Sequence, residues 1–377
     1  MNLIVRFMRP VALLGLFCVT ACTWSETRKS ESSIKKLKQI TQEEAVIKSE
    51  PGPAMIHGDA HHRSVLLANG DVFLFGREMQ VPQLYKHKEN RIVKAKGPVT
   101  PEAKLRKDGK ILINGYLVAG PYGNLHLEEA LLQAHKIEYP SNAILCYLPN
   151  RCEILIAGGV ISDNGTRDST QVTKIFNLKT GIISRVGNLK NDRDSGTATL
   201  LRDGRVLIHG GETTHEGGHL IYSETEIYDS KNRTFSHGPN ASDQLSGYES
   251  IVYDNGLVLL PEQTPNGLCF PIDVVDTKNN RTIRTLRPKW AEPLTNITQL
   301  LDGSVLLIFG GRKLAILNEK FELVPAGSLA SRRYCAGICV LPSGKVFLSG
   351  GYDLTYGSRL PLVTTELLSV NKNNIFY

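Results

Sequence analysis

Short apolar strands that follow tight turns recur along most of this chain. Each copy has a turn, usually ending in Gly, then a run of apolar residues, and in most copies a closing pair of glycines. The copies are NGDVFLFG (69–76), DGKILING (108–115), RCEILIAGG (151–159), DGRVLIHGG (203–211), NGLVLLP (255–261), DGSVLLIFGG (302–311) and SGKVFLSGG (343–351). Corresponding turn positions lie between 39 residues apart (Gly70 to Gly109) and 52 residues apart (Cys152 to Gly204). Repeats of this length are typical of solenoids and β-propellers.

Residues 195–238 form the clearest repeat. SGTATLL and RVLIHGG read as two strands joined by Asp203-Gly204, and a D-G pair favours a tight hairpin because glycine accepts positive φ without a Cβ clash. SETEIYD, which alternates polar and apolar residues, and TFSHG supply two more strands. Packing such antiparallel sheets in a ring buries both faces of each sheet and protects its edges. The sequence therefore predicts an all-β protein, a β-propeller with seven four-stranded blades.

Two repeats depart from the pattern and leave six blades as the alternative. Asn114-Gly115 and Leu260-Pro261 stand where the Gly pair is expected, and LHLEEALLQA (125–134) in the second repeat also fits a short helix. The last repeat holds sequence for four strands, which would let the ring close by face packing alone. EEAVIKS (43–49) offers another closure, as an edge strand of the first or the last blade.

The repeats resemble the kelch family. Arg193 to Gly211 with Glu226-Ile227-Tyr228-Asp229, and Arg332 to Gly351 with Glu366-Leu367-Leu368, match its pattern of a leading Arg, a tight turn, an apolar strand with two glycines and a third strand beginning with Glu. The similarity covers about His57 to Tyr377 and is greatest to the bacterial type found in the central domain of galactose oxidase. It implies a kelch-type β-propeller over residues 56–377.

The first 22 residues read as an export signal. Arg6 and Arg9 precede a short apolar run, and Val19-Thr20-Ala21 ends directly before Cys22. This arrangement resembles a bacterial lipoprotein signal, which implies that residues 1–21 are removed and that Cys22 carries a lipid anchor. An ordinary secretory peptide or an N-terminal membrane anchor is the alternative, although the run is short for a bilayer. Thr23, in place of Asp, implies the outer membrane of the cell envelope, on its periplasmic side.

Residues 22–55 are rich in Ser, Lys, Glu, Thr and Gln and predict a flexible tether after the lipidated Cys22. Over the whole chain 44 Lys and Arg face 37 Asp and Glu, a net charge of +7, and the two signs are interleaved. Because no basic stripe with aromatic residues stands out, we expect no nucleic-acid partner. The tether lysines Lys35, Lys36 and Lys38 could still attract acidic lipid head groups or polysaccharide.

The cysteines predict neither a metal site nor a disulfide framework. Cys146 and Cys152 flank a turn and could pair, but Cys152 stands at the position that Gly holds in other turns. Cys335 and Cys339 lie four residues apart in one expected strand, beyond the reach of a disulfide. No spacing matches a zinc site, and we expect no metal or other cofactor.

Ligand-binding residues are expected on the propeller face where loops follow the Gly pairs and lead into the innermost strands, because a rigid scaffold positions such loops. Tyrosine, arginine and acidic residues gather there and suit sugars or acidic peptides. The candidate ligand-binding residues are Arg193, Glu212, His215, Arg332, Arg333, Tyr334, Tyr352 and Asp353. Arg193 and Arg332 have a second interpretation, because the leading arginines of kelch repeats also bond to neighbouring backbone carbonyls.

Enzymatic interpretations of this face rest on weaker signals, and we assign no catalytic residue. His215-Glu216-Gly217-Gly218-His219 spells H-E-x-x-H, which binds zinc on a helix, but two glycines after a strand predict an exposed loop. The copper site of galactose oxidase needs a Tyr-His pair, which this sequence lacks. A sugar mutarotase or epimerase, resembling the periplasmic kelch sialic-acid mutarotase, is the alternative, with Glu212, Glu216, Arg193 and His215 as polar groups.

Together these patterns predict a cell-envelope lipoprotein without enzymatic activity. Its kelch propeller would act as a scaffold that binds a protein or carbohydrate ligand at the loop-rich face. The membrane, reached through the lipid at Cys22, would be its other partner.

Overall fold

The structure is a computed structural model that describes most of the propeller region. The described residues are 46–60, 62–76, 79–98, 102–108, 110–119, 128–163, 166–215, 218–242, 250–253, 255–261, 271–288, 292–354 and 360–371. The chain divides into Met1–Ala45 and Val46–Tyr377, and only the second unit contains described residues. The predicted signal, the lipidation at Cys22 and most of the tether therefore lie outside the described residues, as does Cys269. No helix among the described residues is long and apolar enough to cross a membrane.

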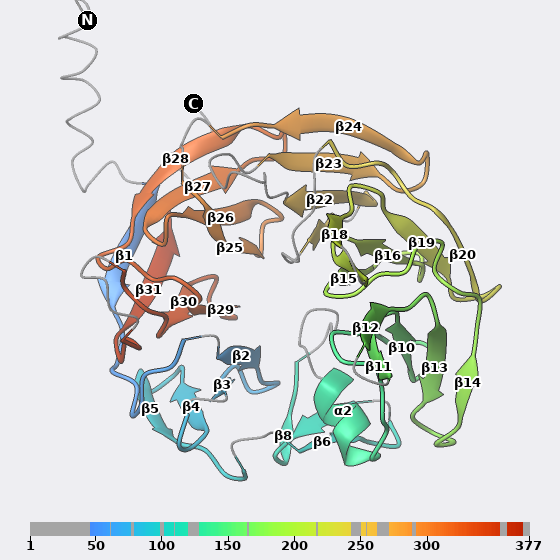
Figure 1. Cartoon of the computed structure of the whole chain (residues 1–377). Helices are drawn as coiled ribbons and strands as arrows, with labels where there is room; N and C mark the ends of the chain where they lie inside the picture. The colour runs from blue at the N-terminus through green and yellow to red at the C-terminus, as the bar shows by residue number, and fades with distance from the viewer. Residues whose placement is uncertain are drawn as a thin grey trace, which may run out of the picture. The chain divides into compact units, whose positions relative to one another are not determined.

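Seven sheets form a ring of blades around a central axis (Figure 1). Blade one contains β2 (Arg63–Leu66), β3 (Val72–Phe75), β4 (Gln83–Lys86) and β5 (Arg91–Lys94). Blade three contains β9 (Ile144–Leu148), β10 (Glu153–Ala157), β13 (Thr173–Asn177) and β14 (Ile183–Arg185). Blade four contains β15 (Thr197–Leu200), β16 (Val206–His209), β19 (Glu226–Asp229) and β20 (Thr234–His237). The predicted seven-bladed propeller is confirmed.

The remaining four-stranded blades follow the same order from the axis outwards. Blade five contains β21 (Ile251–Val252), β22 (Leu257–Pro261), β23 (Ile272–Asp276) and β24 (Arg281–Leu286). Blade six contains β25 (Leu294–Gln299), β26 (Val305–Phe309), β27 (Lys313–Leu317) and β28 (Leu323–Ser328). Blade seven contains β29 (Gly337–Val340), β30 (Val346–Ser349), β31 (Thr365–Val370) and β1 (Ile47–Pro51).

Blade two differs from the others, at one of the repeats that the sequence marks as unusual. Its described residues form a three-stranded sheet of β6 (Ala103–Leu105), β7 (Ile111–Ile113) and β8 (Tyr116–Leu117). Helix α2 (Glu128–Ala134) follows and confirms the short helix expected there. It buries Ala130, Leu131 and Leu132 in the cluster shared with blades one and three, so it contributes apolar surface to this part of the ring.

The N-terminal strand β1 closes the ring. It pairs antiparallel with β31, with Ile47 opposite Val370 and Pro51 opposite Glu366. The edge strand expected from residues 43–49 is therefore confirmed, and it belongs to the last blade. Closure by face packing alone is wrong, because the outermost strand of blade seven comes from the other end of the propeller sequence.

The apolar core lies between neighbouring blades. The second strands, such as β26 and β30, are buried along their whole length. One cluster joins Leu306 and Ile308 of β26 to Val346 and Leu348 of β30, and includes Ile47 of β1. Full burial of one such side chain stabilises the fold by about 1.5–3 kcal/mol. Because each interface between blades buries several of them, these interfaces stabilise the propeller.

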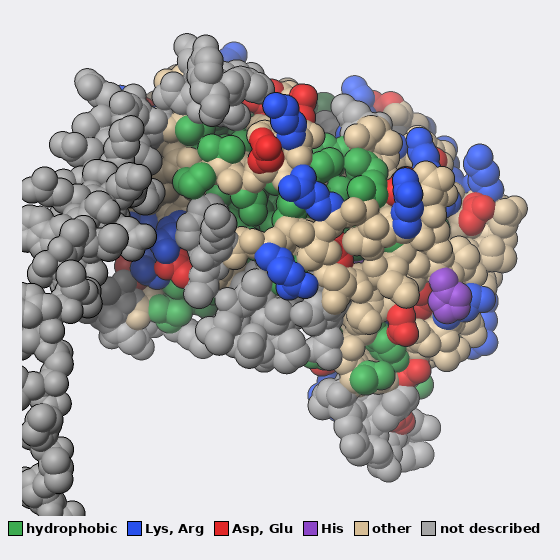
Figure 2. Space-filling view, turned by 90° about the horizontal axis from the view of Figure 1, so that it is seen from above, with side chains coloured by type: hydrophobic (Ala, Val, Ile, Leu, Met, Phe, Trp, Pro, Cys, Tyr) green, Lys and Arg blue, Asp and Glu red, His purple; other side chains and the backbone are tan. Residues whose placement is uncertain are grey.

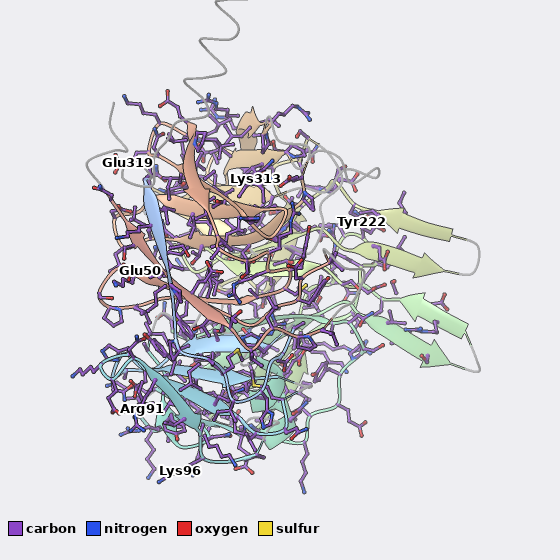
Figure 3. All side chains as sticks on the ribbon, turned by 90° about the vertical axis from the view of Figure 1, so that its left-hand side faces the viewer. Glu50, Arg91, Lys96, Tyr222, Lys313 and Glu319 are labelled. Carbon is purple, nitrogen blue, oxygen red and sulfur yellow. The ribbon has the colours of Figure 1, made fainter. Side chains whose placement is uncertain are left out.

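Two extra hairpins extend from one face of the ring. β11 (Val160–Asp163) with β12 (Thr166–Ser169) follows the second strand of blade three, and β17 (Glu212–His215) with β18 (Gly218–Ile221) follows that of blade four. β12 and β17 are in contact, and Figure 3 shows both hairpins projecting on the same side. They carry exposed apolar side chains at Ile161, Leu220 and Ile221.

The cysteines of the described chain are all free, so Cys146 and Cys152 do not form a disulfide. Cys152 takes the positive φ of 52° that its turn position requires, as Gly does in the other turns. One expectation is corrected: Cys335 has a φ of 53° and precedes β29, which begins at Gly337, so Cys335 and Cys339 do not share an extended strand.

Candidate functional site

A central cavity of about 1270 Å³ lies along the innermost strands. Its wall comes from β2, β15, β21, β25 and β29, with turn residues of blades three and four at one end. We call it the channel. Its position follows from the repeat, because the first strand of each blade stands nearest the axis.

Hydroxyl and amide groups make up much of the channel wall. They belong to Ser64, Thr199, Ser250, Thr295, Asn296, Thr298 and Gln299. Asn296 donates from Nδ2 to the carbonyl of Ala336 at 3.1 Å, while its buried Oδ1 has no hydrogen-bond partner among the described groups. An unpaired buried acceptor costs about 1–3 kcal/mol.

Two histidines are bonded to hydroxyl groups here: His62 lines the channel, and His209 lies behind Thr199. His62 Nε2 is 2.7 Å from Ser349 Oγ, which is 3.3 Å from Ser64 Oγ. In blade four, His209 Nε2 is 3.3 Å from Thr199 Oγ1, which also bonds to Ser250.

His209 stays neutral near physiological pH. Its side chain has no exposed surface, and burial first, then the charge of Arg193, lowers its pKa to about 3. Removal of a charged imidazole from water explains the direction of this change.

Basic side chains outnumber acidic ones along the channel. The charged residues that line it, other than His62, are Arg63, Arg151, Arg202 and Lys231, against Asp203. Asp203 is paired with Arg205 at 2.8 Å, and Arg151 with Glu153 at 3.0 Å. Arg63 is exposed, and its side chain forms no ion pair or hydrogen bond within the described structure. The channel wall therefore carries more basic than acidic side chains.

Several predicted residues meet beside the channel where the chain enters blade seven. Tyr334 and Tyr352 pair through both backbone hydrogen bonds, and their rings stack with centroids 5.7 Å apart. Arg332 donates to the Tyr334 hydroxyl at 3.4 Å and to the Gly310 carbonyl at 3.2 Å. Cys335, which lines the channel, has its Sγ 4.0 Å from the Tyr352 hydroxyl. Arg332, Tyr334 and Tyr352 are only partly buried, so a ligand can reach this group.

Arg193 and Arg333 occupy a different environment, and their candidate assignment is corrected. Arg193 has no exposed surface and donates to the Gly210 carbonyl at 2.6 Å, beside Glu226. Arg333 is 1% exposed and bonds to Glu366 at 2.9 Å. The two residues are equivalent in blades four and seven. Both hold the leading segment to its own blade, which is the second interpretation given for Arg193.

Glu212, His215 and Asp353 are placed on the expected face but not in one cluster. Glu212 begins β17, and its backbone pairs with Asp194 in the way that Tyr352 pairs with Tyr334. His215 ends β17, so the H-E-x-x-H residues lie on a hairpin and not on a helix. Asp353 follows Tyr352 and is partly buried. The side chains of His215 and His219, and the whole of Glu216, lie outside the described structure.

Arg63 and Asn296 are functional candidates that sequence reasoning missed. Each lies on the first strand of a blade, whereas the candidate residues predicted from the sequence lie in loops and entry segments. A weak signal was present, since both are large polar residues at positions facing the axis. The two long hairpins were read as loops because their strands are short and polar.

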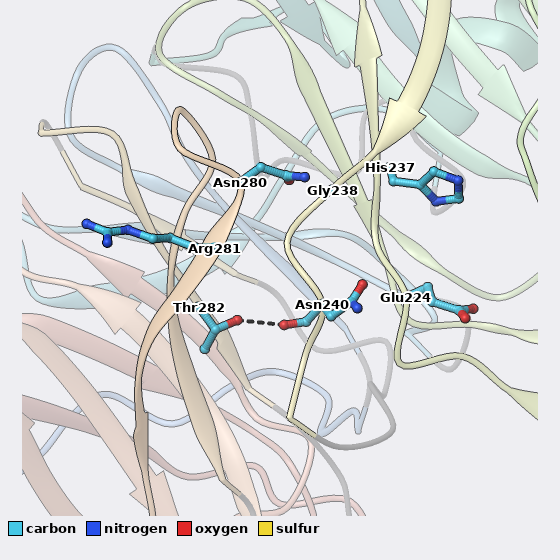
Figure 4. Close-up of a pocket in the computed structure, with 7 residues that line it drawn as sticks. All are labelled: Glu224, His237, Gly238, Asn240, Asn280, Arg281 and Thr282. Carbon is cyan, nitrogen blue, oxygen red and sulfur yellow. Dashed lines mark hydrogen bonds between the residues drawn. The ribbon is translucent and has the colours of Figure 1, made fainter.

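A second, shallower cavity of about 600 Å³ lies between blades four and five (Figure 4). Thr282 donates from Oγ1 to the Asn240 carbonyl across it, and Arg281 and Glu224 point away from each other. Because its polar groups do not converge, we interpret it as a seam between blades.

No family model matches the chain, and no curated protein matches it. Among solved structures, the chain is similar to a protein described as "Structure of YjhT", with a TM-score of 0.50 and 11% identity over 85% of this chain and 98% of the other. At this identity the likeness concerns the fold alone, a seven-bladed β-propeller.

Proposed function

We propose that this protein is a lipid-tethered cell-envelope propeller that binds an anionic carbohydrate in its channel. The observation that carries the proposal is the channel wall, which combines hydroxyl and amide groups with an excess of basic side chains. Ligand sites of this kind are concave and place a few polar groups precisely within a rigid frame. The kelch relationship and the lipid at Cys22 rest on the sequence resemblance.

Three features suit a sugar that carries a carboxylate. Arg63 has an unpaired guanidinium, which can take a carboxylate in a bidentate arrangement. Asn296 places a side-chain amide on the channel wall, where hydrogen bonds to sugar hydroxyls can form. The stacked Tyr334 and Tyr352 offer aromatic surface and hydroxyls beside the channel.

Binding can be tested by calorimetry with uronic acids and neutral hexoses. We expect an acidic sugar to bind, and Arg63→Gln to weaken it at least tenfold, because a charged hydrogen bond contributes about 1.5–3 kcal/mol. Arg185→Gln is the matched control, since Arg185 ends the outermost strand of blade three and is exposed. Equal affinity in both variants, or no preference for acidic over neutral sugars, would contradict the channel as the site.

The location is tested separately. Mass measurement of the mature N-terminus should give a chain that starts at an acylated Cys22. A chain beginning elsewhere, or an unmodified cysteine, would remove the membrane from the proposal and leave sugar binding unaffected.

A sugar mutarotase or epimerase is the second candidate. It is favoured by the His62–Ser349 pair beside Ser64, because a histidine–hydroxyl pair that lines the channel can move a proton to and from a bound hydroxyl. Proton NMR of a bound sugar distinguishes the two: exchange of anomers or epimers faster than in buffer supports the enzyme, and unchanged exchange supports a binding protein.

A further inference from the structure

A lysine recurs in the outer turns of the propeller, between the third and fourth strands of a blade. These residues are Lys88, Lys179, Lys231, Lys278 and Lys320, in blades one, three, four, five and six. All are exposed, and none has a side-chain hydrogen bond or ion pair within the described structure. We call them the lysine rim.

In these outer turns the Asn and Asp side-chain oxygens bond to backbone amides of the turn, while the lysine ammonium groups extend into solvent. Lys179 donates its backbone amide to Asn177 Oδ1 at 3.0 Å, and Lys231 donates to Asp229 Oδ1 at 2.8 Å. The same contact occurs at Lys278 and Lys320. These side-chain oxygens are therefore used by the turn backbone, while each lysine side chain extends into solvent.

Acidic neighbours neutralise only part of this charge. In blade one, Glu89 is paired with Arg91. In blade six, Glu319 and Glu322 are exposed on either side of Lys320. In blades four and five, Asp229 and Asp276 lie in the same turns as Lys231 and Lys278. Figure 2, which views the ring from its edge, shows Lys and Arg side chains with acidic side chains among them.

The lysine rim lies on the face opposite the two hairpins. Figure 3 labels Arg91 and Glu319, which belong to the outer turns of blades one and six, on the side away from the hairpins and from Tyr222. The chain also enters the propeller on this side: the Val46 carbonyl, directly before β1, accepts a hydrogen bond from the amide of Asn371, directly after β31.

Two large apolar side chains stand exposed in turns of the same face. Ile182 is 62% exposed in the outer turn of blade three, and Leu301 is 67% exposed in the inner turn of blade six. Lysines beside exposed apolar side chains are the combination that binds a membrane interface, with the charge at the head groups and the apolar group below it.

We infer that the lysine rim rests on the anionic phospholipid head groups of the membrane that holds the anchor. The inference rests on the proposed lipid anchor for the presence of a membrane, and on the rim for the orientation of the propeller. A single acyl chain binds a membrane only marginally, and each nearby lysine adds attraction to an anionic surface. The hairpins and the mouth beside Tyr334 then face away from the lipid.

Flotation with lipid vesicles tests the rim without the anchor. The chain from residue 22 onward, carrying Cys22→Ser, is mixed with vesicles of phosphatidylglycerol and phosphatidylcholine, or of phosphatidylcholine alone. The rim variant combines Lys179→Gln, Lys278→Gln and Lys320→Gln, three rim lysines that do not line the channel. The matched control loses the same charge from the other face through Arg167→Gln, Arg185→Gln and Lys190→Gln.

We expect binding to anionic vesicles that weakens in high salt, and a loss of about fivefold per lysine, roughly a hundredfold for the rim variant. The control variant should lose less than threefold. Three results would each overturn the inference. They are equal losses of binding in the two variants, equal binding to neutral vesicles, and binding to a soluble anionic polysaccharide without binding to vesicles. Sugar binding in the channel is measured on the same proteins, so failure of that function is seen separately.

Discussion

Replacement of Arg333 by Met should destabilise the propeller far more than the same change at its neighbour Arg332. Arg333 is buried and donates to Glu366, to the carbonyls of Gly350 and Thr364 at 3.0 and 2.7 Å, and to the Thr364 hydroxyl. Met fills a similar volume but leaves these acceptors without the donor. Glu366 then stays buried without its charge partner, a loss that costs about 3–5 kcal/mol.

The expected change in melting temperature follows from the size of the folding unit. Val46–Tyr377 contains 332 residues (377 − 45). At about 2.1 cal/mol/K per residue, the unfolding entropy is roughly 0.7 kcal/mol/K, so the loss corresponds to about 4–7 °C. Arg332→Met removes a partly exposed side chain and should lower the melting temperature by less than about 1 °C.

Differential scanning calorimetry is used to compare Arg332→Met, Arg333→Met and the double variant Arg333→Met with Glu366→Gln. The double variant tests whether the lost ion pair is the cause of the instability. Burial opposes ionisation of Glu366, yet hydrogen bonds from Ser49 and Ala330 and the charge of Arg333 bring its pKa below its ordinary value. In the double variant no unpaired carboxylate remains, so part of the stability should return. Equal shifts for Arg332→Met and Arg333→Met, or a double variant as unstable as the sum of its single changes, would refute a buried ion pair as the reason.

Three further predictions concern stability. His209 is neutral in the folded protein, with a pKa of about 3, but takes up a proton in the unfolded chain below about pH 6.5. The free energy of unfolding, measured in urea, should therefore be about 2 kcal/mol lower at pH 5 than at pH 8. His209→Gln should abolish this part of the loss. Ile47→Ala in the closing strand should cost about 2–5 kcal/mol in the same assay, whereas exposed Lys48→Ala should cost under 0.5 kcal/mol. Gly211→Ala should prevent folding or lower the melting temperature by several degrees, because its Cβ would clash with the Asp194 carbonyl. Gly204→Asn shares the positive φ, at 86°, but meets no atom within 4 Å, so it should lower the melting temperature much less.

The sequence predicts the blades well because each blade is local. A tight turn, an apolar strand and a Gly pair all fall within one repeat, and these short-range signals are enough to place most of the strands. Closure of the ring depends on a contact between β1 and β31, more than 300 residues apart, so the sequence could suggest an edge strand but not decide its partner. Blade two shows that local signals can also fail. Its repeat departs from the pattern, so the sequence alone does not decide between six and seven blades.

The candidate site was less predictable, because neighbouring residues of the same type have different roles. Arg332 and Arg333 are adjacent, yet only Arg333 is buried against Glu366, and only Arg332 touches Tyr334. The equivalent position in blade four is Arg193, since Arg193 and Arg333 bond to the carbonyls of Gly210 and Gly350 in the same way. The position of an arginine within the repeat tells whether it is structural or accessible, and that position is known only once the strand pairing is known.

The same register suggests where function resides in this propeller. Positions shared by blades four and seven, such as the buried arginines and the glutamates of their third strands, hold each leading segment to its own sheet. At the next paired position the blades differ: Tyr334 with Tyr352 stands where blade four has Asp194 with Glu212, on the same backbone bridge. Because that frame is common to both blades, such side chains can change without loss of the fold. Residues that break the repeat at the channel and its mouth, Arg63 among them, are therefore the ones in which ligand specificity should be sought.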